Sequence, residues 1–370
     1  MKKLHLTLVF LCLVSWLNAQ NLTLPAGGFN QKSGIWQRIG ITDVKITWDA
    51  PGVKGREGQI FGTTVVHYGF QNLGFGTSQA APWRAGANEC TTFEVSTDVK
   101  IDGQLLPKGK YGFFIAVYPD SCTLLFSKNS QAWGSFFYDP ADDALRVTVR
   151  QQKNLPGSRE WLAYTFSDPT ENSAVVALEW ERWRIPFTVS VDLAGTVIAS
   201  MRRELQSSTG FIGSNWQYAA QFCLQKETNL EEALTWANNA INPPLGIESF
   251  STLQLKAQIL EKLKRTEESE KIMQAALDKA TILEMHGYGR QLISQKKPAK
   301  ALEVFLANFK KNGDTWPTHV GLARGYSAAG DLQKALEHAK IALPQAPDDL
   351  NRKSVEGMIK TLNSGKALGQ

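Results

Sequence analysis

The chain has 370 residues, of which 43% are hydrophobic and 20% are charged, and this length suits two globular domains. An aromatic share of 10% argues against disorder, because these rings can be buried in a packed core. No run of 18 apolar residues lies within the body of the chain, which argues against a membrane-spanning helix there. The formal charge of +5 is too small to indicate a nucleic-acid partner.

The first 19 residues predict a secretory signal peptide. Lys2 and Lys3 precede an apolar run that ends at Trp16, and Ala19 supplies a small residue for cleavage. An amphipathic first helix is the alternative, but the run is too apolar for one. Loss of the two lysines would leave 38 basic and 35 acidic residues, a charge of +3. We therefore expect a periplasmic or secreted protein that is cleaved near Ala19.

Three cysteines follow the cleavage site: Cys90, Cys122 and Cys223. An oxidising compartment permits one disulfide among them. Cys122 alternates in phase with Leu124 and Phe126, so it is expected to point inward, whereas Cys90 is out of phase with its apolar neighbours. A bond between Cys90 and Cys122 stays open, and three buried thiols are favoured.

From about Ile41 to Val191 the apolar residues recur with a period of two. Val44, Ile46 and Trp48, for example, alternate with polar residues. Half-buried antiparallel strands have this pattern, because successive side chains point to opposite faces of a sheet. Turn residues such as the Asp-Gly pair at 102–103 separate about nine such runs. The pattern predicts an antiparallel β-sandwich or barrel over residues 34–191.

After Asp192 the apolar spacing becomes helical, which predicts a helix from about Leu193 to Leu205 within a linker over residues 192–213. The region 214–370 then repeats, since Ala301 precedes Ala335 by 34 residues and Gly289 precedes Ala323 by the same interval. Such spacing is typical of tetratricopeptide repeats. We expect four helical hairpins and a capping helix, with an ordinary helical bundle as the alternative. The fold class is therefore α+β in two domains, the second an all-α tetratricopeptide-like solenoid.

Several strings in the β half are unusual, among them WRAGANECTTF (83–93), LPKGKYGFF (106–114) and WGSFFYDPADDALRVTV (133–149). In this order they resemble the domain-of-unknown-function 2911 family (DUF2911) of secreted or envelope proteins from Bacteroidetes-type bacteria. The resemblance covers roughly residues 34–191. It implies a secreted β-domain and no particular activity.

The string from Trp83 to Glu89 is the strongest candidate ligand site in the β half. Arg84 can fork onto a carboxylate or onto a pair of sugar hydroxyls, and Trp83 can stack on a ring. Asn88 and Glu89 would then orient the ligand. The alternative is a structural corner, in which Arg84 pairs with Glu89 while Asn88 caps the turn.

Two further candidates lie upstream. Arg56 closes a glycine-spaced basic loop that suits an anion, although a solvated turn is the simpler interpretation. His67 is the only histidine of the β half, and a hydrolase would need it as base beside Arg84 and Glu89. The sequence has no zinc-site spacing and no nucleophile elbow, so we expect no metal and no cofactor.

In the repeat half, the inner groove of such arrays is lined by the first helix of each hairpin. The groove candidates are Tyr218, His286, Arg290 and Arg324. Arg290 and Arg324 are 34 residues apart, so they are expected on the same face, where they could grip the carboxylates of a peptide. The alternative is that both are solvated charges.

These observations favour an interaction or adaptor protein over an enzyme, with a protein or peptide in the repeat groove and an unknown ligand or envelope contact at the β-domain. The alternatives are a hydrolase acting on a glycan or peptide, and a carbohydrate-binding module. Convergence of His67, Arg84 and Glu89 in one pocket would favour the hydrolase. An exposed platform of Trp36, Trp83 and Trp133 would favour sugar binding.

Overall fold

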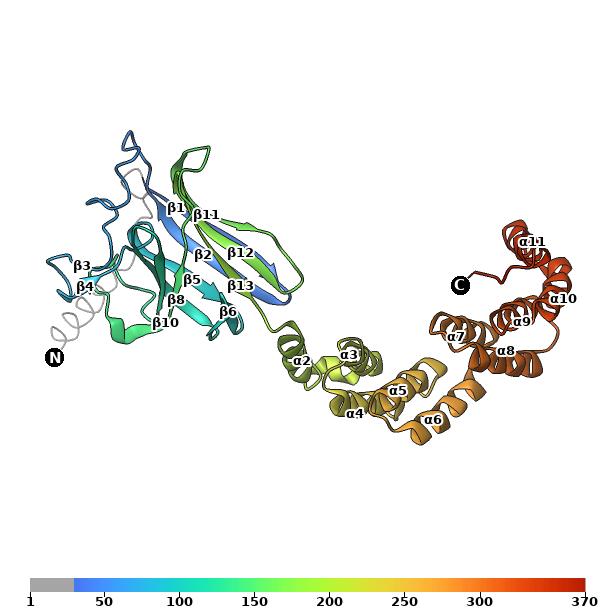
Figure 1. Ribbon diagram of the computed structural model, residues 1–370. Coiled ribbons are helices and arrows are strands. Elements are labelled where there is room, and N and C mark those ends of the chain that lie inside the picture. The colour runs from blue at the N-terminus through green and yellow to red at the C-terminus, as the bar shows by residue number, and fades with distance from the viewer. Residues whose placement is uncertain (1–29, 370) are drawn as a thin grey trace, which may run out of the picture. The chain divides into compact units, whose positions relative to one another are not determined.

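The computed structural model describes residues 30–369, and the predicted signal peptide lies outside this range. The chain divides into two compact units, one ending at Val197 and the other beginning at Ile198 (Figure 1). No helix among the described residues is long and apolar enough to cross a membrane.

The first unit is a sandwich of two antiparallel sheets. The six-stranded sheet has the order β1 (Gln31–Ile39), β2 (Thr42–Ala50), β5 (Ala87–Val95), β8 (Gly109–Val117), β9 (Cys122–Ser127) and β10 (Asp143–Val149). The five-stranded sheet has the order β11 (Arg159–Ser167), β12 (Ser173–Glu181), β13 (Trp183–Ser190), β6 (Val99–Ile101) and β7 (Gln104–Leu106). A short pair, β3 (Gln71–Asn72) and β4 (Ala80–Ala81), stands apart. Neither sheet closes on itself, so the sandwich is confirmed and the barrel alternative is wrong.

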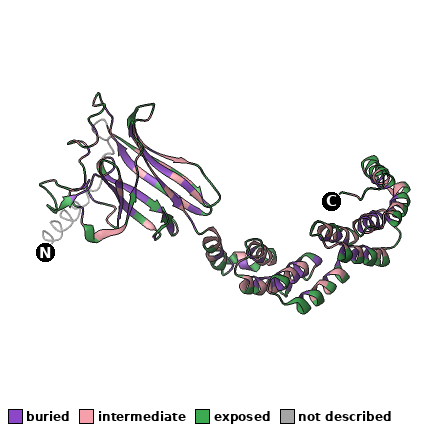
Figure 2. Cartoon of the chain, viewed as in Figure 1, coloured by how far each residue is buried: buried purple, intermediate pink, exposed green. Residues whose placement is uncertain are grey.

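The main core of this unit lies between the two sheets. Figure 2 shows buried and exposed residues alternating along the strands, as the period of two predicts. In β2, Val44 and Ile46 are fully buried while Lys45 between them is exposed. At the turn from β6 to β7, which the Asp-Gly pair predicts, Asp102 and Gly103 both have positive φ, 44° and 85°, as in a type I′ hairpin.

The six-stranded sheet is also buried on part of its outer face. There Phe114 and Leu125 pack against Cys90 and Tyr138, which the loops flanking the sheet help to enclose. Cys122 belongs to the core between the sheets. All three cysteines of the described chain are free and buried. Because Cys90 and Cys122 lie on opposite faces of one sheet, the disulfide between them does not form.

The second unit consists of helical hairpins followed by a last helix. The hairpins are α3 (Gly213–Gln225) with α4 (Leu230–Ile241), α5 (Phe250–Lys262) with α6 (Thr266–Lys279), α7 (Ile282–Ser294) with α8 (Pro298–Asn312), and α9 (Trp316–Ala328) with α10 (Leu332–Ala342). Helix α11 (Asp349–Asn363) follows them. The four predicted hairpins and the capping helix are confirmed. Helix α2 (Leu193–Glu204) precedes them, and the Asp192 carboxylate accepts a hydrogen bond from the Gly195 amide at 3.1 Å, as an N-cap does.

Small residues bring α7 and α9 close together around one aromatic ring. Phe305 of α8 is fully buried between Gly289 of α7 and Gly321 and Gly325 of α9. A Cβ atom at any of these glycines would lie 2.5 to 2.7 Å from the Phe305 ring. The absence of side chains there lets the two first helices approach, and this approach positions the site described below.

Candidate functional site

The β-sandwich unit has a cavity of about 630 Å³ at one end. It is bordered by the end of β2, the start of β5, the loops that follow β2 and β9, and Trp180 of β12. Five of the six ligand-site candidates predicted from the sequence line it, namely Arg56, His67, Trp83, Arg84 and Asn88. The sixth, Glu89, does not. Its side chain is half exposed and forms an ion pair with Lys32.

Arg84 is held in place on the cavity wall. Its Nη1 donates a hydrogen bond to the Asn88 carbonyl oxygen at 2.8 Å, and its guanidinium carbon lies 5.2 Å from the centre of the Phe136 ring. The guanidinium also lies against Gly134, where a Cβ would come within 2.4 Å of Nη1. No carboxylate among the described residues pairs with Arg84, so the Arg84–Glu89 pair of the corner alternative is absent. Burial lowers the pKa of the Arg84 guanidinium, because the surroundings disfavour its charge.

Arg56 has a different role. It donates from Nε to the Val53 carbonyl at 3.0 Å and from Nη2 to the Gly52 carbonyl at 2.8 Å. These bonds close its own loop, so Arg56 contributes a charge to the cavity wall from a guanidinium that is already partly engaged. This agrees with the turn interpretation of the loop.

Two polar atoms beside the cavity are buried without a hydrogen-bond partner. They are Nδ1 of His67 and Oγ of Ser135. Burial is also the main cause that lowers the pKa of His67, which keeps the imidazole neutral at neutral pH. Sequence reasoning missed Ser135. The only sequence feature that could have indicated Ser135 is its place directly after Gly134 in the string WGSFF. The residues there do not alternate between apolar and polar, so the sequence does not predict that the hydroxyl reaches a cavity.

The three tryptophans of the sugar-platform alternative do not share one exposed surface. Trp83 is only 6% exposed and stacks on Trp180, with ring centres 6.1 Å apart and planes within 15°. Trp36 and Trp133 are each more than half exposed. The convergence that would favour the hydrolase is partial, because His67 and Arg84 line the cavity and Glu89 does not. No cluster of three His, Cys, Asp or Glu suited to a metal occurs among residues 30–369.

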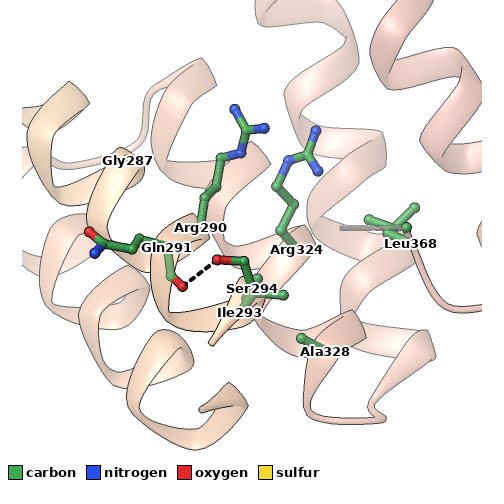
Figure 3. Close-up of a pocket in the computed structure, with 9 residues that line it drawn as sticks. Gly287, Arg290, Gln291, Ile293, Ser294, Arg324, Ala328 and Leu368 are labelled. Carbon is green, nitrogen blue, oxygen red and sulfur yellow. Dashed lines mark hydrogen bonds between the residues drawn. The ribbon is translucent and has the colours of Figure 1, made fainter. Parts of the chain in front are cut away.

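The repeat unit has a cavity of about 340 Å³ between α7 and α9. Arg290 of α7 and Arg324 of α9 line it together, and Figure 3 shows both side chains extending in the same direction. The tail after α11 closes one side, where the Leu368 amide donates to Ser327 Oγ at 2.8 Å. The structure thus brings together the two arginines that the 34-residue spacing placed on one face.

The positive charges of this arginine pair are not neutralised by nearby carboxylates of the described chain. Neither guanidinium has a carboxylate partner within the described part of the chain. The Nε of Arg324 is buried without a hydrogen-bond partner. Burial, and to a lesser degree the charge of Arg290, lower the pKa of Arg324.

A second cavity of about 520 Å³ adjoins the first and shares Gln291 with it. Leu224 of α3, Gln258 of α5 and Lys297 after α7 belong to its lining. In both cavities the lining comes from the first helices of the hairpins, the turns after them and the C-terminal tail. The two cavities therefore form neighbouring parts of one face, built from α3, α5, α7 and α9.

The other two groove candidates do not line the cavity that holds the arginine pair. Tyr218 of α3 is 68% exposed and lines neither cavity. His286 of α7 is partly buried, with Nδ1 at 3.1 Å from the Pro317 carbonyl oxygen. Burial lowers its pKa most, and the charges of Arg324 and Arg290 lower it further.

Comparisons with known proteins give one family match and a distant structural match. Residues 30–189 match the model of a family described as a protein of unknown function, DUF2911. No curated protein matches the chain. Among solved structures, one match is YrrB, which is described as a tetratricopeptide-repeat protein with an unusual peptide-binding site. YrrB is 17% identical to this chain, with a TM-score of 0.28, and the match covers 44% of this chain and 84% of YrrB. The β-sandwich unit is therefore similar, over residues 30–189, to the DUF2911 family, as the strings in its sequence predict.

Proposed function

We propose that this chain is an interaction protein, whose repeat unit binds an extended segment of a partner protein along the face formed by α3, α5, α7 and α9. The observation that carries the proposal is the arginine pair. Two guanidiniums from neighbouring repeats line one cavity, and neither has a carboxylate partner in the described chain. The missing carboxylate would come from the partner, as an acidic side chain or a chain end.

The energetics favour such a ligand. Arg290 and Arg324 repel each other, and the partial burial of Arg324 weakens its hydration. A carboxylate between the two guanidiniums would relieve both costs, and it would accept bidentate, charge-assisted hydrogen bonds. Each such bond contributes about 1.5–3 kcal/mol when it is made to a charged group.

The shape of the face favours an extended chain over a compact small molecule. Stacked repeats make elongated surfaces, because each hairpin adds one more first helix beside the last. Here the cavity with the arginines continues at Gln291 into the cavity that begins at Leu224. A peptide could place its carboxylate at Arg290 and Arg324 and its neighbouring residues along the second cavity.

The β-sandwich unit would then carry a second interaction, either with a small ligand or with an envelope assembly. The basic and apolar start of the sequence, with Ala19 at its end, supports export as the setting for this role. The chain would act as a secreted or periplasmic adaptor that holds a partner through its repeats.

A peptide array tests the proposal. The full chain is applied to immobilised random hexapeptides, made once with free C-terminal carboxylates and once with C-terminal amides. We expect the bound peptides to be enriched in Asp, Glu or free carboxylates, and binding to weaken as salt rises. The Arg290→Gln/Arg324→Gln double variant should bind the selected peptides at least about tenfold more weakly, a loss of about 1.4 kcal/mol.

Arg352→Gln is the matched control, because Arg352 is an exposed arginine on α11 that lines neither cavity. Its binding should equal that of the wild type. Bound peptides without enrichment in carboxylates, or a double variant that keeps full affinity, would contradict the proposal.

A further inference from the structure

We propose that the cavity of the β-sandwich unit binds a small organic anion, whose carboxylate or phosphate group is received by Arg84. This site lies in the other unit from the repeat face and takes a different kind of ligand, so it goes beyond the adaptor function.

The charge of the cavity wall supports an anion. Lys54, Arg56 and Arg84 line the cavity, and its described lining contains no Asp or Glu. Three acidic residues next to it have partners: Asp49 and Glu89 both pair with Lys32, and Glu160 accepts a hydrogen bond from the Lys54 amide at 2.9 Å. The wall is therefore positive, and its field is not cancelled by carboxylates inside it.

Arg84 is preorganised for this role. The Phe136 ring, the Gly134 backbone and the Asn88 carbonyl fix its guanidinium, and the Asn88 contact uses one of its five N–H donors. A ligand that meets a guanidinium already in place does not have to order that side chain on binding. Fixed donors of this kind recognise the planar or tetrahedral oxygens of carboxylates and phosphates.

The backbone near Arg84 is strained in a way that often marks functional sites. Ala85 and Asn88 both have positive φ, 52° and 51°. Asparagine tolerates this conformation, but at Ala85 it costs about 1–2 kcal/mol. The Ala85 carbonyl accepts hydrogen bonds from Tyr164 at 2.8 Å and from Thr91 at 3.2 Å, which hold the strained residue in place.

Polar groups beside the arginine suit the rest of such a ligand. Ser135 Oγ and His67 Nδ1 are buried without partners at the border of the cavity. An unpaired buried polar group costs about 1–3 kcal/mol, so a ligand that supplies hydrogen bonds to either gains from it. With a volume of about 630 Å³ the cavity has the size of small-molecule sites. The chemistry points to a hydroxyl-bearing anion such as a sugar acid or a sugar phosphate.

The test is calorimetric titration of the full chain with four probes: glucuronate, glucose 6-phosphate, inorganic phosphate and neutral glucose. We expect binding of glucuronate or of glucose 6-phosphate, and none of glucose. Glucuronate would assign the site to carboxylates. Glucose 6-phosphate, with or without inorganic phosphate, would assign it to phosphates.

Variants locate the binding. Arg84→Gln should weaken it at least tenfold. Arg150 is an exposed arginine directly after β10, so Arg150→Gln should leave binding unchanged. The Arg290→Gln/Arg324→Gln variant should also leave it unchanged, which separates this site from the repeat face. Ser135→Ala removes a buried hydroxyl that has no partner, so the melting temperature of the ligand-free chain should stay the same or rise while affinity falls several-fold.

The Ser135 variant keeps the test decisive if Arg84→Gln fails to fold. The proposal is overturned if wild type binds none of the anions at millimolar concentration, or if glucose binds as well as they do. It is also overturned if a folded Arg84→Gln chain, or the Ser135→Ala chain, binds like the wild type.

Discussion

Both units place arginine at a cavity where it has no carboxylate partner among residues 30–369, but they hold it in different ways. In the β-sandwich, Arg84 is fixed by a ring, a glycine backbone and a carbonyl oxygen. In the repeat unit, Arg290 is exposed and Arg324 is half-buried, and the Nε of Arg324 has no hydrogen-bond partner among the described residues.

The difference matters for what each site can select. A fixed guanidinium imposes one geometry, and this suits a small ligand whose oxygens must fit that geometry. A pair of less constrained guanidiniums accepts carboxylates at several positions, and this suits side chains along a peptide. The β cavity is therefore expected to discriminate by shape and the repeat face by charge.

The largest expected effect is that of Gly134→Ala. Gly134 has φ +59°, and a Cβ there would lie 2.4 Å from Arg84 Nη1. The substitution combines backbone strain with a clash, so the β-sandwich should lose about 2–4 kcal/mol of stability. Hydrogen exchange at the amides of β5 and β8 measures this loss in the β unit alone.

Gly55→Ala separates the two causes. Gly55 also has positive φ, 76°, but a Cβ there would meet nothing within 4 Å. Gly55→Ala should therefore lower the free energy of unfolding only by the backbone strain of a positive φ, about 1–2 kcal/mol. Equal losses for Gly134→Ala and Gly55→Ala would mean that the contact between Gly134 and Arg84 does not hold the guanidinium.

Gly325→Ala makes the corresponding change in the repeat unit. Its Cβ would lie 2.7 Å from the Phe305 ring, so α9 must move away from α8 and, with it, from α7. Overpacking costs about 1–3 kcal/mol, and the better helix propensity of alanine returns up to about 1 kcal/mol. We expect a net loss in urea unfolding of the repeat unit, together with weaker peptide binding, because Arg324 moves relative to Arg290.

Gly357→Ala on α11 is the matched control. Gly357 is also helical, and its Cβ would meet nothing within 4 Å. Alanine should therefore stabilise the unit by up to about 1 kcal/mol and leave peptide binding unchanged. A Gly325→Ala chain that behaves like Gly357→Ala would show that the close approach of α7 and α9 is not required.

The sequence predicts much of the fold because the relevant signals are local. A period of two defines strands such as β2, and the 34-residue interval between Arg290 and Arg324 places them one repeat apart on the same face. The Asp102-Gly103 turn is equally local. By contrast, period alone does not give the order of strands in a sheet, so it could not separate an open sandwich from a barrel.

The details of the sites depend on partners far apart in the chain. Glu89 follows Arg84 closely in sequence, yet its partner is Lys32, which comes from β1. Ser135 reaches the Arg84 cavity from the loop after β9, and apart from its place after Gly134 the sequence around it does not predict this. Tyr218 lies two repeat lengths before His286. The two residues therefore occupy equivalent positions in their repeats but belong to different hairpins. Local patterns predict which residues are equivalent, and tertiary packing decides which of them meet.

The smallest expected effect compares the histidines of the two units. The pKa of His286 is lowered chiefly by burial and further by Arg324 and Arg290. The pKa of His67 is lowered by burial, its backbone neighbours Tyr68 and Gly69 raise it in part, and Arg84 does not contribute. In NMR titrations the Arg290→Gln/Arg324→Gln variant should therefore raise the pKa of His286.

Arg84→Gln should leave the pKa of His67 nearly unchanged, because no charge of Arg84 contributes to it. The lowered pKa of His286 also predicts how stability depends on pH. A histidine whose folded pKa lies below its unfolded value of about 6.5 binds protons more readily when unfolded, so the repeat unit loses stability as pH falls from about 6.5. Removing Arg290 and Arg324 should reduce that loss. If Arg84→Gln instead moved His67 as far as the double variant moves His286, the two arginine sites would not differ in the way their contacts indicate.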